Sequence, residues 1–403
     1  MAMRRWILTS FALLCTVTGW AQLSVVSGTV VDAATGDAVA GANVQGGPVT
    51  VVTNDDGYFT LKSDQAVDVV TVTHLGYKSA RARTAVGEPL HVRLQPMAIQ
   101  LSEVVVMAME PRELLLTAIG KIALNYSSRP ELYHCFYRET AMKRQHYISV
   151  AEGVVDMYKT GYESDTDRDR VAIRKGRRLL SPKRSDTLSV KVMGGPVTPV
   201  LLDLVKNRDL LLSADELDCY DLKMEAPTTI GDRRQYVVSL RPRRVMPYPL
   251  YFGRLYIDRE TLAFTRAELS LDMSDRLKAT QTMLVRKPMG VRFRPKELLL
   301  LADYRTGADG LTRISYVRTT FRFNCDWRRR LFATAFTAFC EMAVTSSTDL
   351  DVRPIRGRES FDQRDAFYDK VDYFRDPLFW QDYNIIEPTE SLDKAIGKLL
   401  KKY

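Results

Sequence analysis

Short strand patterns separated by glycine-containing turns fill residues 24–95 and restrict what this part of the chain can form. In residues 53–61, TNDDGYFTL, the Asp56-Gly57 pair tolerates the positive φ angles of a tight hairpin turn. Phe59 and Leu61 fall on one face of the strand that follows. Similar runs and turns recur up to Pro96 and give about seven short strands in roughly 70 residues. The pattern predicts a seven-stranded β-sandwich over residues 22–96.

The spacing of glycine and aromatic residues in this segment resembles that of a known domain family. The residues that carry the resemblance are Gly28, Asp32, Gly36, Gly41, Ala42, Val44, Asp56, Gly57, Phe59, Gly76 and Tyr77. They resemble the carboxypeptidase-regulatory-like domain, a transthyretin-like sandwich. In that family the domain is non-catalytic and occurs beside zinc carboxypeptidases and ahead of TonB-dependent outer-membrane receptors. The resemblance implies that the glycines of this set and Asp56 shape turns of the sandwich.

Residues 101–106, LSEVVV, also look like the stretch that follows the domain in those receptors. The plug and long barrel that normally come next cannot fit in the remaining chain. The receptor architecture is therefore not expected here.

The first 21 residues predict a secretory signal peptide. Arg4 and Arg5 form a positive n-region, residues 6–18 an apolar run, and residues 19–21 a small-x-small cleavage site. A twin-arginine signal is the alternative. We expect the mature protein to begin near Gln22, outside the cytoplasm, and no later stretch approaches the roughly 20 apolar residues of a membrane helix.

After a predicted linker, residues 97–112, the pattern changes to one helix followed by long strands over residues 113–403. Apolar residues at helical spacing follow Pro111 and end before Pro130. Strand patterns then turn near Lys143, Gly231 and Asp258, and a short helix interrupts them near residue 198. Because these strands are long and joined in sequence, we predict a mainly β fold with one large, curved antiparallel sheet and few helices.

The chain ends in a predicted amphipathic helix with Leu392, Ile396 and Leu399 on one face and lysines beside it. Such a helix either docks on the domain or lies on a membrane surface. The second outcome would give a peripheral contact with the outer membrane.

Residues 253–269, GRLYIDRETLAFTRAEL, follow a hairpin pattern. Together with the helix before the strands and the inserted second helix, they resemble the LolA-like half-barrel of periplasmic lipoprotein carriers. The whole chain is similar to uncharacterised exported proteins of Gram-negative bacteria that join these two modules. A concave half-barrel face could bury a 14-carbon acyl chain, which would gain on the order of 11 kcal/mol gross. The alternative is a concave face filled by its own side chains.

The four histidines test the hypothesis of a zinc carboxypeptidase. That chemistry needs a His-x-x-Glu pair, and none of the histidines has a glutamate three residues later. In HCFYRE, residues 134–139, His134 and Glu139 differ by an odd number and would point to opposite faces of a strand. Gly-x-Ser-x-Gly and glycine-rich phosphate loops are also missing. We expect no enzymatic activity, no cofactor and no metal site, with a divergent hydrolase built on carboxylates as the alternative.

Two groups of surface residues are candidates for contacts with other molecules. Arginine forks suit phosphate and carboxylate partners, with solvated loops and strand faces as the alternative; the candidates are Arg174, Arg177, Arg178, Arg243 and Arg244. The aromatic stretch near the C-terminus either lids a groove or packs the tail onto the sheet; its candidates are Phe379, Trp380 and Tyr383.

Four cysteines remain after the signal peptide, an even number that permits disulfides in an oxidising compartment. Cys325 and Cys340 flank a predicted strand-turn-strand and are the candidate pair. Buried free thiols are the alternative.

Together these patterns predict a non-enzymatic exported protein that acts by binding in the periplasm or at the inner face of the outer membrane. Its partner would be an apolar ligand, a lipoprotein or another envelope protein, and export argues against nucleic acid. The alternatives are a structural or assembly factor for outer-membrane complexes, or an accessory protein to a separate carboxypeptidase or other hydrolase.

Overall fold

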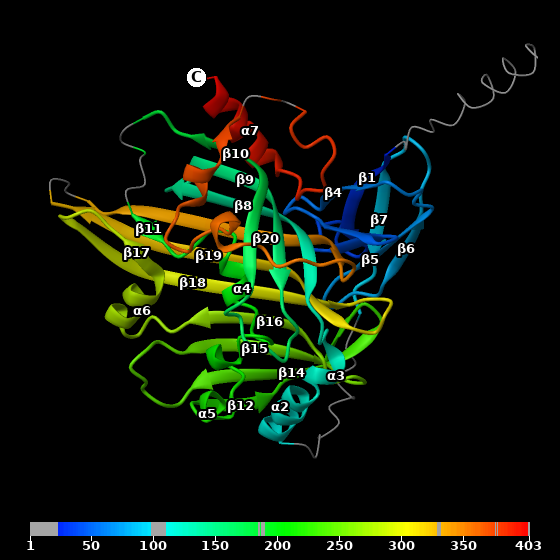
Figure 1. Cartoon of the computed structure of the whole chain (residues 1–403), viewed down its shortest axis with the longest axis horizontal. Helices are drawn as coiled ribbons and strands as arrows, with labels where there is room; N and C mark the ends of the chain where they lie inside the picture. Colours follow the sequence, from blue (N-terminus) through cyan, green and yellow to red (C-terminus); the bar gives the residue numbers. More distant parts are fainter. Residues whose placement is uncertain are drawn as a thin grey trace, which may run out of the picture.

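The computed structural model describes residues 23–97, 110–183, 186, 190–328, 332–374, 376 and 378–401. The predicted signal peptide and most of the predicted linker lie outside the described residues. The structure contains an N-terminal sandwich and a large sheet, and in Figure 1 the sandwich, in blue, lies beside one end of the large sheet.

The N-terminal domain is the predicted sandwich of seven strands, in two sheets. One sheet has the order β4-β1-β7, with β1 (Ser24–Asp32), β4 (Tyr58–Ser63) and β7 (Leu90–Leu94). The other has the order β3-β2-β5-β6, with β2 (Asn43–Gly46), β3 (Val49–Val52), β5 (Val69–Thr73) and β6 (Ala80–Arg83). Alternate residues of these strands point inward and are buried, so the domain has its own apolar core, which includes Val30, Val44, Leu61, Val72 and Leu94.

Most of the predicted turn residues of the sandwich lie in turns, but Gly28 does not. Gly57 has a φ of 74°, and a Cβ there would lie 2.5 Å from the Val30 carbonyl oxygen, so this turn needs glycine. Gly36, Gly41 and Gly76 also have positive φ angles. Gly28 lies inside β1, where a Cβ would meet the Leu90 carbonyl oxygen at 2.3 Å. Its role is to let β7 approach β1 closely, which a turn signal could not reveal.

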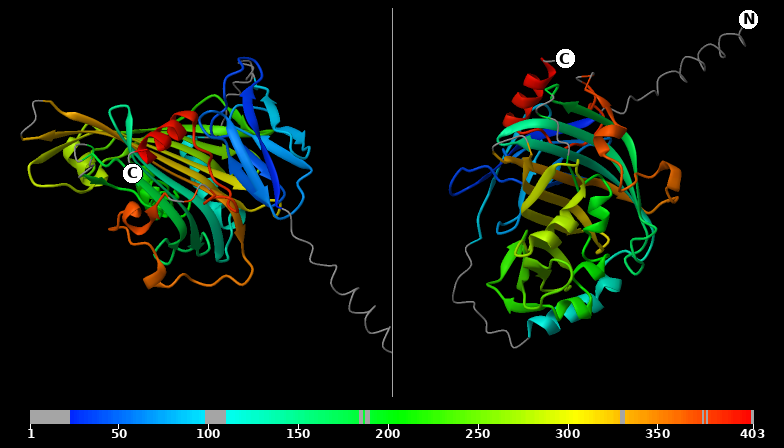
Figure 2. Two further views of the ribbon diagram at one scale, coloured as in Figure 1. Left: turned by 90° about the horizontal axis from the view of Figure 1, so that it is seen from above. Right: turned by 90° about the vertical axis from the view of Figure 1, so that its left-hand side faces the viewer.

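The second domain is built on one open sheet of 12 strands. Its order is β12-β14-β15-β16-β18-β19-β20-β8-β9-β10-β21, with β13 beside β14, and its pairs are antiparallel except β10 with β21. The strands are β8 (Glu131–Lys143), β9 (His146–Lys159), β10 (Arg170–Leu180), β12 (Tyr220–Met224), β13 (Thr228–Ile230), β14 (Arg233–Pro242), β15 (Tyr251–Asp258), β16 (Phe264–Leu271), β18 (Val291–Thr306), β19 (Thr312–Trp327), β20 (Thr334–Thr348) and β21 (Asp372–Tyr373). The predicted turns near Lys143, Gly231 and Asp258 all join consecutive strands, and Figure 2 shows the curvature of the sheet.

One face of this sheet, the inner face, is filled by the protein's own side chains. The helices that cover it are α2 (Pro111–Gly120), α3 (Ile122–Asn125), α4 (Thr198–Leu201), α5 (Ala214–Leu217) and α6 (Arg276–Met283). The domain also contains two short strands, β11 (Lys191–Val192) and β17 (Leu284–Arg286), and three 3-10 helices, η3 (Arg208–Leu210), η4 (Gly357–Glu359) and η5 (Phe367–Lys370). Most of the concave side is therefore a packed core, which was the alternative to an open half-barrel.

The opposite, outer face is covered by other parts of the chain at one end only. Strand β3 of the sandwich lies against β20, and Val52 joins an apolar cluster with Phe136 and Trp380. Residues 378–389, here called the tail, cross the same end, and the C-terminal helix α7 (Glu390–Leu400) docks on β9 and β10 through Leu392, Ile396 and Leu399. The docked form of the predicted terminal helix is thus the one observed.

The tail also joins the sandwich to the sheet by hydrogen bonds. Asn384 exchanges two hydrogen bonds with the backbone of Lys62, and the Lys62 amine donates to the Trp380 carbonyl at 2.7 Å. The Asp56 carboxylate accepts from the backbone N–H of Glu390 at the start of α7. The hairpin turn at Asp56-Gly57 therefore also contacts the C-terminal helix.

A row of charged side chains crosses the outer face from strand to strand. Cross-strand register aligns Arg254, Glu268, Leu301, Arg318, Glu341, Arg138, Glu152 and Arg177. We call the seven charged members the charge ladder. At its covered end Arg138 contacts Glu152 at 2.8 Å and Glu341 at 3.3 Å, and Arg177 contacts Glu152 at 3.1 Å. Burial raises the pKa of Glu152, but Arg138 and Arg177 outweigh it and hold the net pKa below its usual value.

Replacing Arg138 with methionine should destabilise the fold by roughly 3–5 kcal/mol, because Glu152 would remain buried with one counter-charge fewer. Urea unfolding of the wild type and Arg138→Met measures this difference. Arg292→Met, an exposed arginine on β18, is the control and should change stability by less than about 0.5 kcal/mol. Equal losses of unfolding free energy in the two variants would show that the buried ion pairs of Arg138 do not stabilise the fold.

Candidate functional site

A cavity of about 180 Å³ lies at one end of the filled inner face. It is bounded by β8, β9 and β20, by the segment around β11, and by residues 365–368. Apolar side chains form much of its wall: Ala141, Ile148, Val190, Met193, Ala338 and Phe367. Gly195, with φ of 90°, holds the segment after β11 against Phe361, where a Cβ would approach the ring to 2.6 Å.

The wall of this cavity contains the carboxyl group of Glu139 on β8, which is hydrogen-bonded to Tyr137 and lies near the charge of Lys191. The Tyr137 hydroxyl donates to Glu139 Oε2 at 3.0 Å and accepts from the Gly195 N–H at 2.9 Å. Burial raises the pKa of Glu139 to about 7, and the hydrogen bond from Tyr137 and the charge of Lys191 only partly oppose it. The carboxyl therefore keeps its proton to a higher pH than an ordinary glutamate, and in the protonated form it can both donate and accept a hydrogen bond.

The Cys340 thiol beside Glu139 is not poised for nucleophilic chemistry, and the nearby Lys191 amine is held by a backbone carbonyl. Burial, followed by the charge of Glu139, raises the pKa of the Cys340 thiol to about 12, so it is a thiol at neutral pH. The Lys191 amine donates to the Asp365 carbonyl at 2.6 Å, and burial lowers its pKa. The arrangement suits binding of an apolar group that carries one hydrogen-bonding atom.

The predicted opposition of His134 and Glu139 is confirmed, because they lie on opposite faces of β8. The His134 ring contacts Asp156 at 2.9 Å on the outer face, while Glu139 faces the inner cavity. In the sequence, Glu139 stands out only as a possible partner of this histidine. The one feature of the sequence that pointed to Glu139 as a cavity residue was its position as a carboxylate within a strand of mostly apolar residues.

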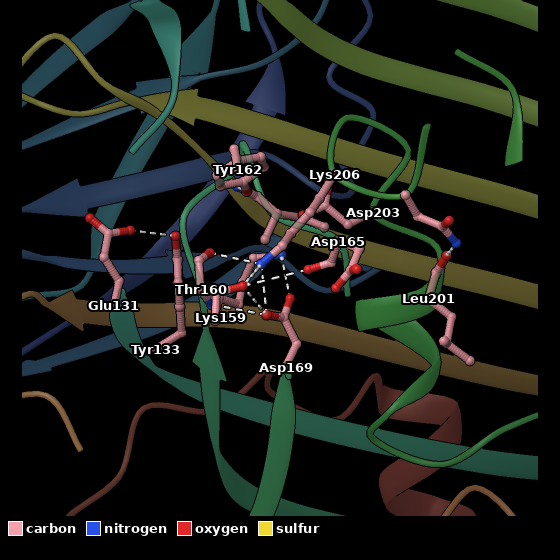
Figure 3. A network of polar contacts seen from close by, with 12 residues as sticks. Glu131, Tyr133, Lys159, Thr160, Tyr162, Asp165, Asp169, Leu201, Asp203 and Lys206 are labelled. Atoms are coloured by element: carbon pink, nitrogen blue, oxygen red, sulfur yellow. Dashed lines mark hydrogen bonds and ion pairs between the residues drawn. The ribbon is translucent and has the colours of Figure 1, made fainter. Parts of the chain in front are cut away.

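A second polar cluster on the inner face is closed and holds the segment of α4 to the sheet (Figure 3). Lys159 on β9 contacts Asp203 at 2.5 Å, and Lys206 contacts Asp169 at 2.6 Å. The Tyr304 hydroxyl donates to Asp203 at 3.0 Å. Burial, and then the charge of Lys159, lower the pKa of Lys206 to about 8. The four charged side chains are at most 1% exposed, so they fasten the fold and do not meet a ligand.

The candidate arginines are not brought together and are largely used inside the chain. Arg174 pairs with Asp156, Arg177 with Glu152, and Arg178 with Asp369 at 3.6 Å. The remaining two lie after β14, far along the sheet order from β10. Of these, Arg243 donates to the Asp218 carbonyl at 3.0 Å, and Arg244 is exposed. The five arginines therefore do not form one site, and their contact with an anionic partner stays a prediction.

The aromatic candidates do not lid the cavity. Trp380 is buried on the outer face, where its Nε1 donates to Glu152 at 3.1 Å and its ring packs edge-on against Phe136. Phe379 and Tyr383 lie in the same apolar cluster. The alternative interpretation, a tail packed onto the sheet, is the correct one.

The candidate disulfide is also wrong. All four described cysteines are buried free thiols. Cys325 faces Thr334 across β19 and β20, whereas Cys340 faces Thr319, which is six residues away from Cys325 along β19. At about 3.3 Å per residue the two thiols are roughly 20 Å apart, too far for a bridge.

The described part of the chain holds no group of three or more histidine, cysteine, aspartate or glutamate side chains placed to share a metal ion. Among the described helices, none is long and apolar enough to cross a membrane.

Comparison with known proteins identifies the first domain. The sequence profile of the CarboxypepD_reg-like domain matches residues 26–106, which confirms the resemblance of the sandwich. No curated protein sequence matches the chain. A solved structure of a DUF1329 family protein from Desulfovibrio piger is similar over 61% of this chain and 96% of that chain, with 10% identity and a TM-score of 0.27. Lipovitellin is similar over 56% of this chain and 26% of that chain, with 8% identity and a TM-score of 0.25. These two similarities are too weak to carry an argument, and the LolA-like architecture stays a prediction.

Stability should depend on pH through Glu139. Its pKa rises from 4.5 to about 7 in the folded state, so the folded carboxyl keeps a proton that the unfolded one has lost. This contribution is complete below pH about 4.5 and is lost as the pH rises through about 7, at most about 3 kcal/mol in total. Urea unfolding from pH 4 to 8, compared with Glu139→Gln, measures it.

The Glu139→Gln protein should lose this pH dependence, whereas Glu113→Gln on the exposed side of α2 should keep it. Parallel curves for the wild type and Glu139→Gln would contradict the assignment.

Proposed function

We propose that the protein acts by binding and without catalysis, and that the inner cavity receives a small apolar group of its ligand. The observation that carries this proposal is the combination of apolar walls with one glutamate carboxyl, Glu139, which is hydrogen-bonded to Tyr137 and has a raised pKa. Ligand sites of this kind are mostly apolar and use a few placed polar groups to fix orientation.

The size of the cavity narrows the ligand expected from sequence. An engineered cavity of about 150 Å³ in another protein admits benzene, and the present one has about 180 Å³. It can enclose an aromatic ring, a branched aliphatic group or the first carbons of an acyl chain. It cannot enclose a whole 14-carbon chain, because the rest of the inner face is occupied by α2–α6 and their neighbours.

A non-catalytic role is supported by the chemistry around Glu139. A thiol whose pKa is raised to about 12 is a weak nucleophile, and the Tyr137 hydroxyl is engaged with Glu139 and Gly195. The matched sandwich belongs to a regulatory-like domain family, which agrees with the same view. The predicted signal peptide of residues 1–21 supports action in the periplasm or at the inner face of the outer membrane.

Phenol and benzene are suitable probes because both are small enough for the cavity. Phenol has one hydroxyl group that can hydrogen-bond to Glu139, and benzene has none. We expect both to raise the melting temperature of the wild-type protein, phenol more strongly because of Glu139. Ligand at a hundred times its Kd stabilises a protein by about 2.7 kcal/mol, which a thermal scan detects.

Ala141→Leu should fill the cavity and abolish the shift for both probes. Ala335→Leu, at an exposed alanine of β20, is the matched control and should leave it unchanged. An unchanged shift in Ala141→Leu, or no shift in the wild type, would overturn the proposal.

A further inference from the structure

The uncovered end of the outer face contains a larger groove. Its volume is about 720 Å³, and it is lined by β14, β15, β16, β18 and β19, with Phe339 of β20 at the side nearest the sandwich. It lies on the face of the sheet opposite the Glu139 cavity, so an occupant here would be a second binding partner.

An apolar row runs along the floor of this groove. Register places Phe252 beside Ser270, Ser270 beside Leu299, Leu299 beside Thr320, and Thr320 beside Phe339. Phe252 is 45% exposed and Leu299 is 37% exposed. Large apolar side chains that share one surface groove are typical of interaction sites.

The charges beside this row favour an anionic occupant. Five arginines and two glutamates line the groove: Arg241, Arg254, Arg266, Arg318, Arg322, Glu225 and Glu268. Three of the arginines are already paired: Arg266 with Glu268 at 2.8 Å and with Asp303, Arg318 with Asp55, and Arg322 with Glu297. Arg254, next to Phe252 on β15, is exposed and has no carboxylate partner among the described residues. It is the open end of the charge ladder.

The chain's own tail shows what fits this face. At the covered end the same ladder receives a peptide: Trp380 donates to Glu152, and Arg138 donates to the backbone carbonyl of Ile386. The tail is also acidic, with Asp382 and Glu387 beside its apolar side chains. At both ends of the outer face, arginine and glutamate side chains of the same cross-strand row lie beside apolar side chains, but among the described residues only the end at β8–β10 is covered by the tail.

We propose that the groove binds an extended acidic peptide segment of a partner protein. A carboxylate of the segment pairs with Arg254, and an aromatic or aliphatic side chain packs on Phe252 and Leu299. Peptide is favoured over lipid because hydroxyl groups of Ser270 and Thr320 alternate with the apolar side chains along the row. A peptide backbone can satisfy these hydroxyls, whereas an acyl chain would bury them without partners.

The probe is a fluorescein-labelled synthetic peptide, LFWQDYNIIEP, with the sequence of residues 378–388. Fluorescence anisotropy with the purified full chain should show saturable binding. Arg254→Glu and Phe252→Ser should each weaken it by about tenfold or more, because each removes a central contact of the groove. Arg244→Glu and Phe332→Ser, at exposed positions outside the groove, should leave it unchanged.

Two further outcomes would overturn the proposal. Binding that is insensitive to Arg254→Glu would mean that the probe displaces the tail at the β8–β10 end instead. Co-sedimentation with equimolar phosphatidylcholine–phosphatidylglycerol vesicles that depends on Arg254, without peptide binding, would assign the groove to a lipid surface.

A peptide with Asp382 and Glu387 changed to Asn and Gln should bind about tenfold more weakly if the carboxylate contact is correct. Ala141→Leu should not affect any of these results, so failure here is distinct from failure of the cavity proposal.

Discussion

The charge ladder is the constraint on which the arrangement of the whole molecule depends. Removing an arginine or a glutamate from water costs several kcal/mol unless counter-charges flank it. On the outer face each buried charge has its opposite on the next strand, as Glu152 has between Arg138 and Arg177. Because side chains on neighbouring strands neutralise these charges, the apolar residues of the tail and the sandwich can cover them. The ladder continues into the sandwich through Arg318 and Asp55, so the register of the sheet also fixes where the first domain docks.

The two faces of the sheet differ in how much of their surface the chain itself covers. The inner face receives the helices and is fastened by the buried pairs of Lys159 with Asp203 and Lys206 with Asp169, which leaves room for only a small group beside Glu139. The outer face has no such filling beyond the sandwich and the tail. The larger open volume, the groove, therefore lies on the outer face of the sheet. From the sequence, a ligand was expected on the opposite, concave face.

Local patterns predicted local structure well, and failed where contacts join distant residues. The turns at Asp56-Gly57, Gly231 and Asp258, the helix after Pro111 and the helix ending the chain follow from neighbouring residues and were predicted. Gly28 was misassigned because a close approach between β1 and β7 leaves the same mark in sequence as a turn. The Cys325–Cys340 pair failed because a sequence does not state the register of β19 and β20. Glu139, Arg254 and the burial of Trp380 depend on which face each strand presents to which segment, and no single stretch of sequence contains that information.

The tail has a consequence for the order in which the molecule is made. Asn384 and Lys62 are 322 residues apart, and Asp56 contacts the first turn of α7. Domains near the N-terminus generally fold first during synthesis, and the sandwich has its own core. Its bonds to the tail and to α7 cannot form until residues 384–390 are synthesised. The hairpin turn at Asp56-Gly57 is therefore synthesised long before α7, the helix that it contacts. A chain truncated before residue 378 would have a folded sandwich but would lack the tail that bonds it to the sheet.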